Sequence, residues 1–324
     1  MKKTVSLLLV LIMLVSFSAV SFAEEAGGKV TVRLGGLTGP TTMGMAGLLQ
    51  SNEAGTARNH YVFTLAGTAD ELTPLFVKGE LDMISVPVNL GSVLYNKLDG
   101  NVTMVCVNTL GVLYILEKGG ETILSPADLK GKTIYATGKG STPEFTLRCL
   151  LKNCGIDPDK DVTIIFKSEP AEIVAEMEVM PNAVCMLPQP YVTAALGKLP
   201  DTRIALDVTE EWGKVSDTEL ITSAVFVRKD FLEAHPDAVA LFMEDFEDSV
   251  AFVNGSPAEA AAVIGSYGIV NAAVAQKAIP YCHIVCMKGE QMQKAAEAWL
   301  AILLNEKPAS VGGALPEKGF YYQP

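Results

Sequence analysis

Short β-type runs alternate with helical segments along most of the chain, and this alternation constrains the fold more than any other feature of the sequence. The first series begins at the strand-like run Val30–Leu34 and reaches Val102–Val107, and the second runs from Lys132–Ala136 to Ala183–Leu187. Strands joined through helices pair in parallel, because the helix carries the chain back along the face of the sheet. The pattern therefore predicts an α/β fold with parallel-rich sheets covered by helices.

The same local arrangement occurs twice, which predicts two similar lobes. A strand, a loop rich in glycine and threonine, and a helix follow one another at residues 30–50 and again at residues 132–153. A later β-type run, Ala224–Val227, is expected to return the chain to the first lobe, and the remainder is largely helical in pattern. We expect lobe 1 to comprise residues 24–110 and 224–324, and lobe 2 to comprise residues 111–223.

Two crossovers are expected to join the lobes, one near residues 108–114 and one near residues 222–224, where the alternation is interrupted. Open α/β sheets bind their ligands at the carboxyl ends of the strands. The loops of both lobes would then face a shared cleft, and lobes joined by a hinge can close on a ligand held between them.

The first 23 residues have the pattern of a secretory signal peptide. Lys2 and Lys3 precede the apolar run Val5–Val15, and Ser21 and Ala23 place small residues at the −3 and −1 positions of a cleavage site. The alternative is an uncleaved membrane anchor, but an anchor needs about 20 apolar residues. We expect cleavage after Ala23 and an extracytoplasmic protein, in the periplasm or at the cell surface, with no cysteine placed for lipid attachment.

Acidic residues exceed basic ones, which bears on the partners of the protein. The 37 Asp and Glu residues against 25 Lys and Arg residues give a formal net charge of −12, and the leader removes two of the lysines. Such a field repels phosphate backbones and anionic lipid, which excludes nucleic acid as a partner but not a small anion in a local pocket. A chain of this length can bury enough surface to fold without disulfide or metal, and we expect a monomer.

The six cysteines are interpreted as mostly free, buried thiols. An even number of cysteines outside the cytoplasm permits three disulfides, but spacing alone cannot pair them. Cys106 and Cys185 lie in apolar strand-like runs, where cysteine behaves as a small hydrophobic residue. The metal-like cluster Cys282-His283-x-x-Cys286 lacks the second pair of ligands that a structural zinc site needs, so no metal is expected.

Catalytic patterns are absent from the sequence. His60, His235 and His283 are the three histidines, and no Gly-x-Ser-x-Gly nucleophile motif occurs. The Gly/Thr loops match neither a Walker phosphate loop nor a dinucleotide fingerprint. We therefore expect a protein that is not an enzyme and has no cofactor.

The two Gly/Thr loops are the first candidate binding elements. Their glycines let the backbone approach a ligand, their hydroxyls can hydrogen-bond to it, and the helix that follows presents unpaired N–H groups. Each loop alone also fits an ordinary turn, but equivalent loops in two lobes favour binding. The candidate residues are Thr38, Thr41 and Thr42 in the first loop and Lys139, Ser141 and Thr142 in the second.

Four further candidates lie outside these loops. Asn89 and Gln189 follow the strands at residues 83–86 and 183–187, and their amides can donate and accept hydrogen bonds. Tyr191 offers a ring and a hydroxyl, and Trp212 lies in a loop-like segment. Ordinary turn chemistry is the alternative for the residues that follow the strands.

Four segments together resemble the solute-binding proteins of the nitrate, sulfonate and taurine transport family. They are Gly79–Met83, Ser125–Ile134, Cys154–Val162 and Phe226–Leu232, and the resemblance covers nearly the whole mature chain. It implies a type II periplasmic-binding fold, and a protein that delivers a small solute to the permease and ATPase of an ABC transporter. Those proteins often carry an acidic residue where Gln189 precedes Pro190 here, so their usual ligands do not transfer directly.

Two other functions stay open at this point. The same superfamily includes a pyrimidine synthase of thiamine biosynthesis, but its cysteine-rich iron motif does not occur here. A secreted sensor that presents its solute to a receptor would share every sequence feature with a transport protein. Lys139 is the single cation of the candidate loops, which favours a small polar or aromatic solute over a strongly charged dianion.

Overall fold

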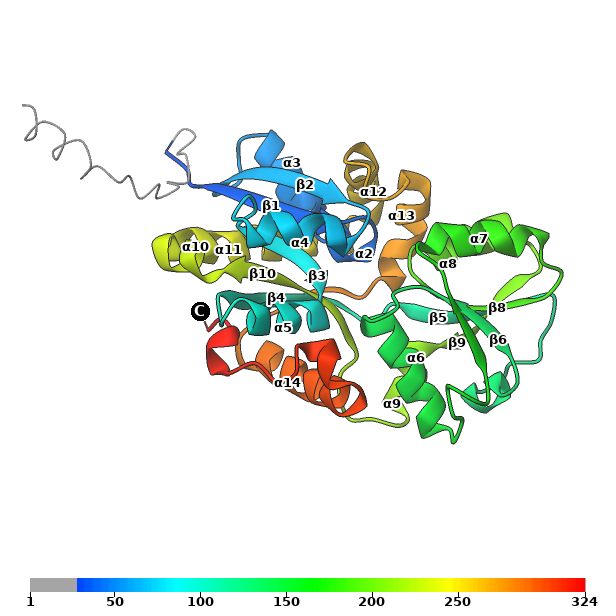
Figure 1. Ribbon diagram of the computed structural model, residues 1–324. Coiled ribbons are helices and arrows are strands. Elements are labelled where there is room, and N and C mark those ends of the chain that lie inside the picture. Colours follow the sequence, from blue (N-terminus) through cyan, green and yellow to red (C-terminus); the bar gives the residue numbers. More distant parts are fainter. Residues whose placement is uncertain (1–27, 324) are drawn as a thin grey trace, which may run out of the picture.

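The computed structural model describes residues 28–323, and it consists of two lobes that each contain one β-sheet (Figure 1). The signal peptide and cleavage site expected within residues 1–24 lie outside the described residues. In the part of the chain that is described, no helix is long and apolar enough to cross a membrane.

The first lobe is built on a six-stranded sheet with the order β11-β4-β10-β3-β1-β2. β1 pairs in parallel with β2 and β3, whereas the pairs that involve β10 and β11 are antiparallel. Its strands are β1 (Thr31–Leu37), β2 (His60–Ala66), β3 (Met83–Pro87), β4 (Val102–Leu110), β10 (Ile221–Arg228) and β11 (Ile284–Met287).

The second lobe is built on a five-stranded sheet with the order β7-β6-β8-β5-β9. β6 pairs in parallel with β7 and β8, and β5 pairs antiparallel with β8 and β9. Its strands are β5 (Leu113–Lys118), β6 (Thr133–Ala136), β7 (Thr163–Phe166), β8 (Ala183–Pro188) and β9 (Thr202–Asp207).

The prediction of two α/β sheets is confirmed, but the sheets are mixed and not parallel-rich. Only β1, β2 and β3 of the first sheet and β6, β7 and β8 of the second belong to parallel βα series. The strands that enter each sheet from the other lobe, β5 and β10, run antiparallel to their neighbours. A strand that arrives through a crossover has no preceding helix in its own sheet to set a parallel direction.

Helices cover both sheets (Figure 1). In the first lobe they are α2 (Pro40–Met43), α3 (Ala46–Glu53), α4 (Ala69–Val77), α5 (Val88–Lys97), α10 (Lys229–Ala234), α11 (Pro236–Gly255), α12 (Pro257–Ser266), α13 (Ala272–Ala278) and α14 (Gly289–Glu306). In the second lobe they are α6 (Thr142–Asn153), α7 (Pro170–Val179), α8 (Tyr191–Lys198) and α9 (Val208–Gly213). Short 3₁₀ turns are η1 (Pro126–Leu129), η2 (Ile279–Tyr281), η3 (Pro308–Val311) and η4 (Lys318–Phe320).

Two segments cross between the sheets. Gly111 and Val112 link β4 to β5, within the segment expected for the first crossover. The second crossover, expected near residues 222–224, lies earlier: α9 and residues 214–220 lead from β9 into β10, which starts at Ile221. The boundary expected between residues 223 and 224 therefore falls inside a strand of the first sheet.

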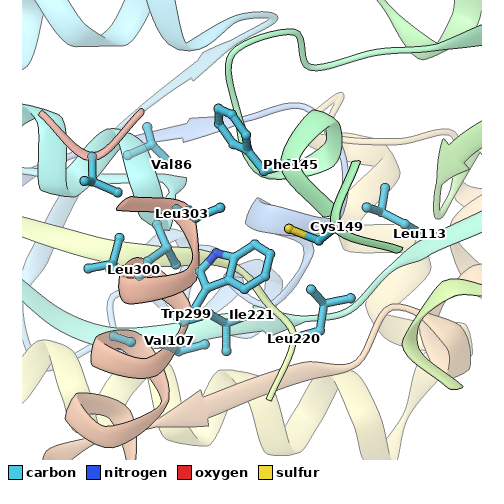
Figure 2. Packing of buried hydrophobic residues seen from close by; sticks show 14 of the residues in the cluster. Val86, Val107, Leu113, Phe145, Cys149, Leu220, Ile221, Trp299, Leu300 and Leu303 are labelled. Carbon is cyan, nitrogen blue, oxygen red and sulfur yellow. The ribbon is translucent and has the colours of Figure 1, made fainter. Parts of the chain in front are cut away.

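One hydrophobic cluster extends from the first lobe into the second. Figure 2 shows Trp299 and Leu303 of α14 beside Phe145 and Cys149 of α6, with Leu113 of β5 nearby. Separate clusters lie between the first sheet and α11, and between the second sheet and α7 and α8. The lobes therefore share apolar packing on the side of α6 and α14.

Candidate functional site

A cleft of about 800 Å³ lies between the lobes, at the carboxyl ends of β1, β2 and β3 and of β6 and β7. This is the place where open α/β sheets bind ligands. The lining residues of the first lobe are Leu37, residues 67–70, Pro87, Asn89, Leu90, Val93, Ala309 and Ser310, and those of the second are residues 138–141 and 166–168. Both lobes thus contribute loops and helix starts to one cavity.

Asn89 forms polar contacts between the lobes at the cleft. Its side chain is buried at 3% exposure in the first turn of α5. Its Nδ2 donates to the carbonyl of Ser310 at 3.1 Å and to that of Gly140 at 3.4 Å, and its Oδ1 accepts from Thr142 Oγ1 at 3.4 Å. Asn89 therefore joins the first lobe to the loop before α6 directly.

The second Gly/Thr loop lines the cleft, but several of its polar groups already form hydrogen bonds within the loop or with the helix that follows it. Gly138 and Gly140 have φ of 73° and 78°, which glycine adopts without strain. Ser141 Oγ donates to the carbonyl of Gly138 at 2.8 Å, and Glu144 Oε2 accepts from the backbone N–H of Gly140 at 2.6 Å. Lys139 is exposed and lines this wall of the cleft.

The first Gly/Thr loop differs from the expected structure. Gly35–Leu37 belongs to β1, and the threonines lie in the short helix α2, where Thr41 and Thr42 are buried. Neither of them lines the cleft, because the chain turns inward at Pro40 and packs α2 against the sheet. Among residues 28–323 no hydrogen-bond partner is found for either hydroxyl.

A buried polar network lies under α2 and was missed by the sequence analysis. Asn108 Nδ2 donates to the carbonyl of Thr41 at 2.7 Å and to Ser85 Oγ at 2.8 Å, and its Oδ1 accepts from Ser223 Oγ at 2.7 Å. The three side chains come from the adjacent strands β3, β4 and β10. A signal was available, since each is a polar residue within a largely apolar strand.

Tyr191 and Thr38 approach each other from opposite lobes. Burial raises the pKa of the Tyr191 hydroxyl, the nearby Glu169 carboxylate adds to the rise, and a hydrogen bond from Thr38 opposes it. Gln189 is also buried, and its Oε1 accepts from the backbone N–H and the hydroxyl of Thr193. These side chains lie outside the lining of the cleft.

Trp212 lies in α9 and not in a loop, which corrects the expectation. Asp207 caps that helix by accepting from the backbone N–H groups of Thr209 and Glu210. The Trp212 ring is 2% exposed and packs edge-on against Trp299, with a centroid separation of 5.3 Å. Its indole N–H donates to the carbonyl of Thr218 at 2.8 Å, so the residue stabilises the second crossover.

The structure thus brings together Asn89, Lys139 and Ser141 of the predicted residues in the cleft, with Thr142 bonded to Asn89 behind it. The sequence analysis missed the contributions of Asp70, in the first turn of α4 after β2, and of Lys167, in the loop after β7. Each residue lies just beyond the carboxyl end of a parallel strand, so a search for polar residues after every such strand would have found them.

Two lobes, a sheet in each and a cleft between them define the fold class of periplasmic solute-binding proteins. A family model of the NMT1-like family matches residues 74–266, and the chain belongs to this family. No curated protein sequence matches the chain.

Solved structures of binding proteins share the fold. An ABC transporter protein from Parabacteroides distasonis is 21% identical, with a TM-score of 0.76, 90% of this chain covered and 99% of that one. The periplasmic aliphatic sulphonate binding protein SsuA from Escherichia coli is 17% identical (TM-score 0.74, 91% and 92% covered). The periplasmic nitrate-binding protein NrtA from Synechocystis PCC 6803 is 14% identical (TM-score 0.56, 72% and 65% covered).

Proposed function

We propose that the protein is an extracytoplasmic solute-binding protein that captures a small polar or aromatic solute between its lobes and delivers it to an ABC importer. The observation that carries this proposal is the cleft of about 800 Å³, to which both lobes contribute the carboxyl ends of their parallel strands. Pockets that bury small ligands have volumes in the range of roughly 300 to 1,000 Å³. Membership of the NMT1-like family and the likeness to importer binding proteins support the same reading.

The proposed residues of the site follow from its walls. Asn89 and Ser141 hydrogen-bond the polar end of the solute, Lys139 reaches over it, and apolar Leu37, Leu90 and Phe166 contact its body. The other sequence-derived candidates stay predictions; they are Thr38, Thr41, Thr42, Thr142, Gln189, Tyr191 and Trp212. Lobe 1 is proposed to contain residues 24–110 and 224–324, and also residues 221–223, which begin β10. Lobe 2 then contains residues 111–220.

The protein acts on its solute by binding and closure, with no chemical step, and works as an exported monomer. Mass spectrometry of the exported protein should find a chain that begins at Glu24. Retention of residues 1–23 would contradict export by a cleaved signal peptide.

The direct test of function is to purify the exported protein without refolding, release its solute by denaturation and identify it by mass spectrometry. Calorimetry with that compound should give one site per chain. A Ser141→Ala variant should bind it about two- to tenfold more weakly, the effect of one lost hydrogen bond. Deletion of the gene should abolish high-affinity uptake of the same compound, and unchanged uptake would contradict the transport role.

A further inference from the structure

Two of the six cysteines lie on neighbouring strands of the first sheet with their thiols in contact. All six are free thiols in the structure. Cys106 belongs to β4 and Cys286 to the edge strand β11, and their thiols hydrogen-bond to each other. No other pair of thiols among residues 28–323 is hydrogen-bonded. This pair is therefore distinguished from the four remaining cysteines.

The pairing of β11 with β4 brings the two side chains to one face of the sheet. Cys106 belongs to the hydrophobic cluster between the first sheet and α11, and Cys286 packs against that cluster. The paired neighbours Val107 and Met287 belong instead to the cluster on the side of α14. The two sulfur atoms therefore lie on the same side of two hydrogen-bonded strands.

The two thiols differ in exposure and in acidity. Cys106 is fully buried, whereas Cys286 is partly exposed. Burial, together with the hydrogen bond to Cys286, raises the pKa of the Cys106 thiol. The same hydrogen bond lowers the pKa of Cys286 and outweighs the effect of its burial. Because the thiolate is the nucleophile in disulfide exchange, Cys286 is the thiol that reacts first with an external disulfide.

We propose that Cys106 and Cys286 are a disulfide-forming pair, which joins the edge strand β11 covalently to β4 under oxidising conditions. Hydrogen-bonded thiols need only side-chain rotation and a small shift of the edge strand to bring the sulfur atoms to the bond length of about 2 Å. The proposed export places the protein in a compartment where such bonds persist.

A disulfide of low molecular weight, such as oxidised glutathione, supplies the oxidant. The Cys286 thiolate attacks one of its sulfur atoms, which forms a mixed disulfide and releases one molecule of glutathione. The Cys106 thiol loses its proton, and its sulfur attacks Cys286 Sγ and releases the second glutathione. The two cysteines together lose two electrons, and the oxidant becomes two thiols that take up the two protons.

The bond would form next to the first crossover. β4 continues through Gly111 into the second lobe, and β11 follows η2, where the carbonyl of Tyr281 accepts from Tyr114 of the second lobe. As an edge strand, β11 pairs with a single neighbour, and its register with β4 is irregular. Such a strand opens locally at low cost, so a covalent bond to β4 stabilises the segment beside the hinge.

The test incubates the reduced, folded protein with oxidised glutathione, blocks the remaining thiols by alkylation, and maps peptides without reduction by mass spectrometry. We expect one linked pair of peptides, which contains Cys106 and Cys286. The linked protein should unfold at a temperature several degrees above the reduced one, because the bond closes a long loop of the unfolded chain. Amide hydrogen exchange of residues 284–287 should slow in the linked form.

Two variants test the order of the steps. Cys106→Ala, which suits the apolar site, should stop at a mixed disulfide between glutathione and Cys286. Cys286→Ser should form neither the link nor an adduct at Cys106, because the Cys106 thiol is buried. The matched control is Cys154→Ser, which removes a partly exposed thiol of the second lobe and should link as wild type does. Unfolding curves check that each variant is folded.

Three results with the wild-type protein would overturn the proposal. They are two thiols that stay free, a link from either cysteine to another one, and a glutathione adduct at Cys286 that does not resolve. The outcome does not depend on the proposed function, because the experiment follows only the thiols of the purified chain. Failure of the proposed function would instead appear as uptake that does not depend on the gene.

Discussion

At the scale of single residues, Glu117 is a buried carboxylate whose charge is held by hydrogen bonds. Its side chain, at the end of β5, is 5% exposed. Burial acts to raise the pKa of Glu117, but hydrogen bonds from the hydroxyl and N–H of Thr122, from the N–H of Ile123 and from Arg203 outweigh it and lower the pKa from 4.5 to about 2. The carboxylate thereby fixes the loop that follows β5.

This shift predicts how stability depends on pH. Because the folded-state pKa lies below the unfolded one, the unfolded chain binds the proton first, and stability falls as pH drops from about 4.5 towards 2. At pH 7 the charge contributes on the order of 3 kcal/mol. Urea unfolding of Glu117→Gln should show about that loss at pH 7, and the difference from wild type should shrink below pH 4.5.

The neighbouring Glu121 offers the control for this prediction, since its side chain is exposed. Glu121→Gln should unfold with wild-type stability at every pH. Parallel pH curves for wild type and Glu117→Gln would show that the Glu117 charge does not contribute to folding.

Residue identity in the cleft was predictable only in part from the sequence. Asn89, Lys139 and Ser141 were found because a strand end followed by a polar residue is a local pattern. Thr41 and Thr42 were selected by the same logic, yet they are buried because Gly35 and Gly36 extend β1 and the chain then turns into α2. Whether a hydroxyl faces a cavity depends on packing between distant segments, which no local pattern contains.

At the scale of elements, the two crossovers pack against each other. A Cβ added at Gly111 of the first crossover would lie 2.1 Å from Thr209 Oγ1 and 3.1 Å from Leu220 Cδ2. The His283 ring, beside β11, also contacts the carbonyl of Gly111. The absence of a side chain at residue 111 therefore allows the two segments of the hinge to meet.

Gly111→Ala should destabilise the protein by about 1–3 kcal/mol, because the new methyl group overlaps the Thr209 hydroxyl. The double variant Gly111→Ala with Thr209→Ala removes that hydroxyl and should recover most of the loss in chemical unfolding. Gly197→Ala, in α8 with open space around it, is the control and should not destabilise. Equal losses in the single and double variants would show that contact with Thr209 is not the cause.

Elements were predicted well where helices separate strands, and poorly at the crossovers. The βα series have clear boundaries because capping residues, prolines and glycines end each helix. β5 was missed because it follows β4 after only Gly111 and Val112, so both strands appear as one apolar run. β9 and β11 were missed because their pairing partners are distant in the sequence and their own patterns are short.

At the scale of the whole molecule, the lobes touch at several places besides the cleft. Lys152 of α6 pairs with Glu306 of α14, next to the shared apolar cluster. The Tyr114 hydroxyl of β5 donates to the carbonyl of Tyr281 in η2 at 3.3 Å. Asn89 adds the polar contacts at the cleft itself. Two lobes were predictable from the doubled loop-and-helix pattern, whereas these contacts depend on how the lobes are oriented.

The contacts of Asn89 predict how a single side chain shifts the balance between open and closed forms. Asn89→Ala removes its bonds to Gly140 and Thr142 of the second lobe, so the unliganded protein should spend more time open. Small-angle scattering should then give a larger radius of gyration than wild type, and solute at saturation should reduce the difference. Stability should fall by about 1–2 kcal/mol, the value of the lost hydrogen bonds.

Asn96→Ala separates the effect on closure from the loss of hydrogen bonds as such. Asn96 lies on the same helix, and its Nδ2 donates to the carbonyls of Val311 and Ala314 in the C-terminal segment of its own lobe. This variant should lose similar stability but keep the wild-type radius of gyration, because it breaks no contact between the lobes. An equal radius in all three proteins would mean that Asn89 does not hold the lobes together, and closure would then depend on the apolar cluster and the solute alone.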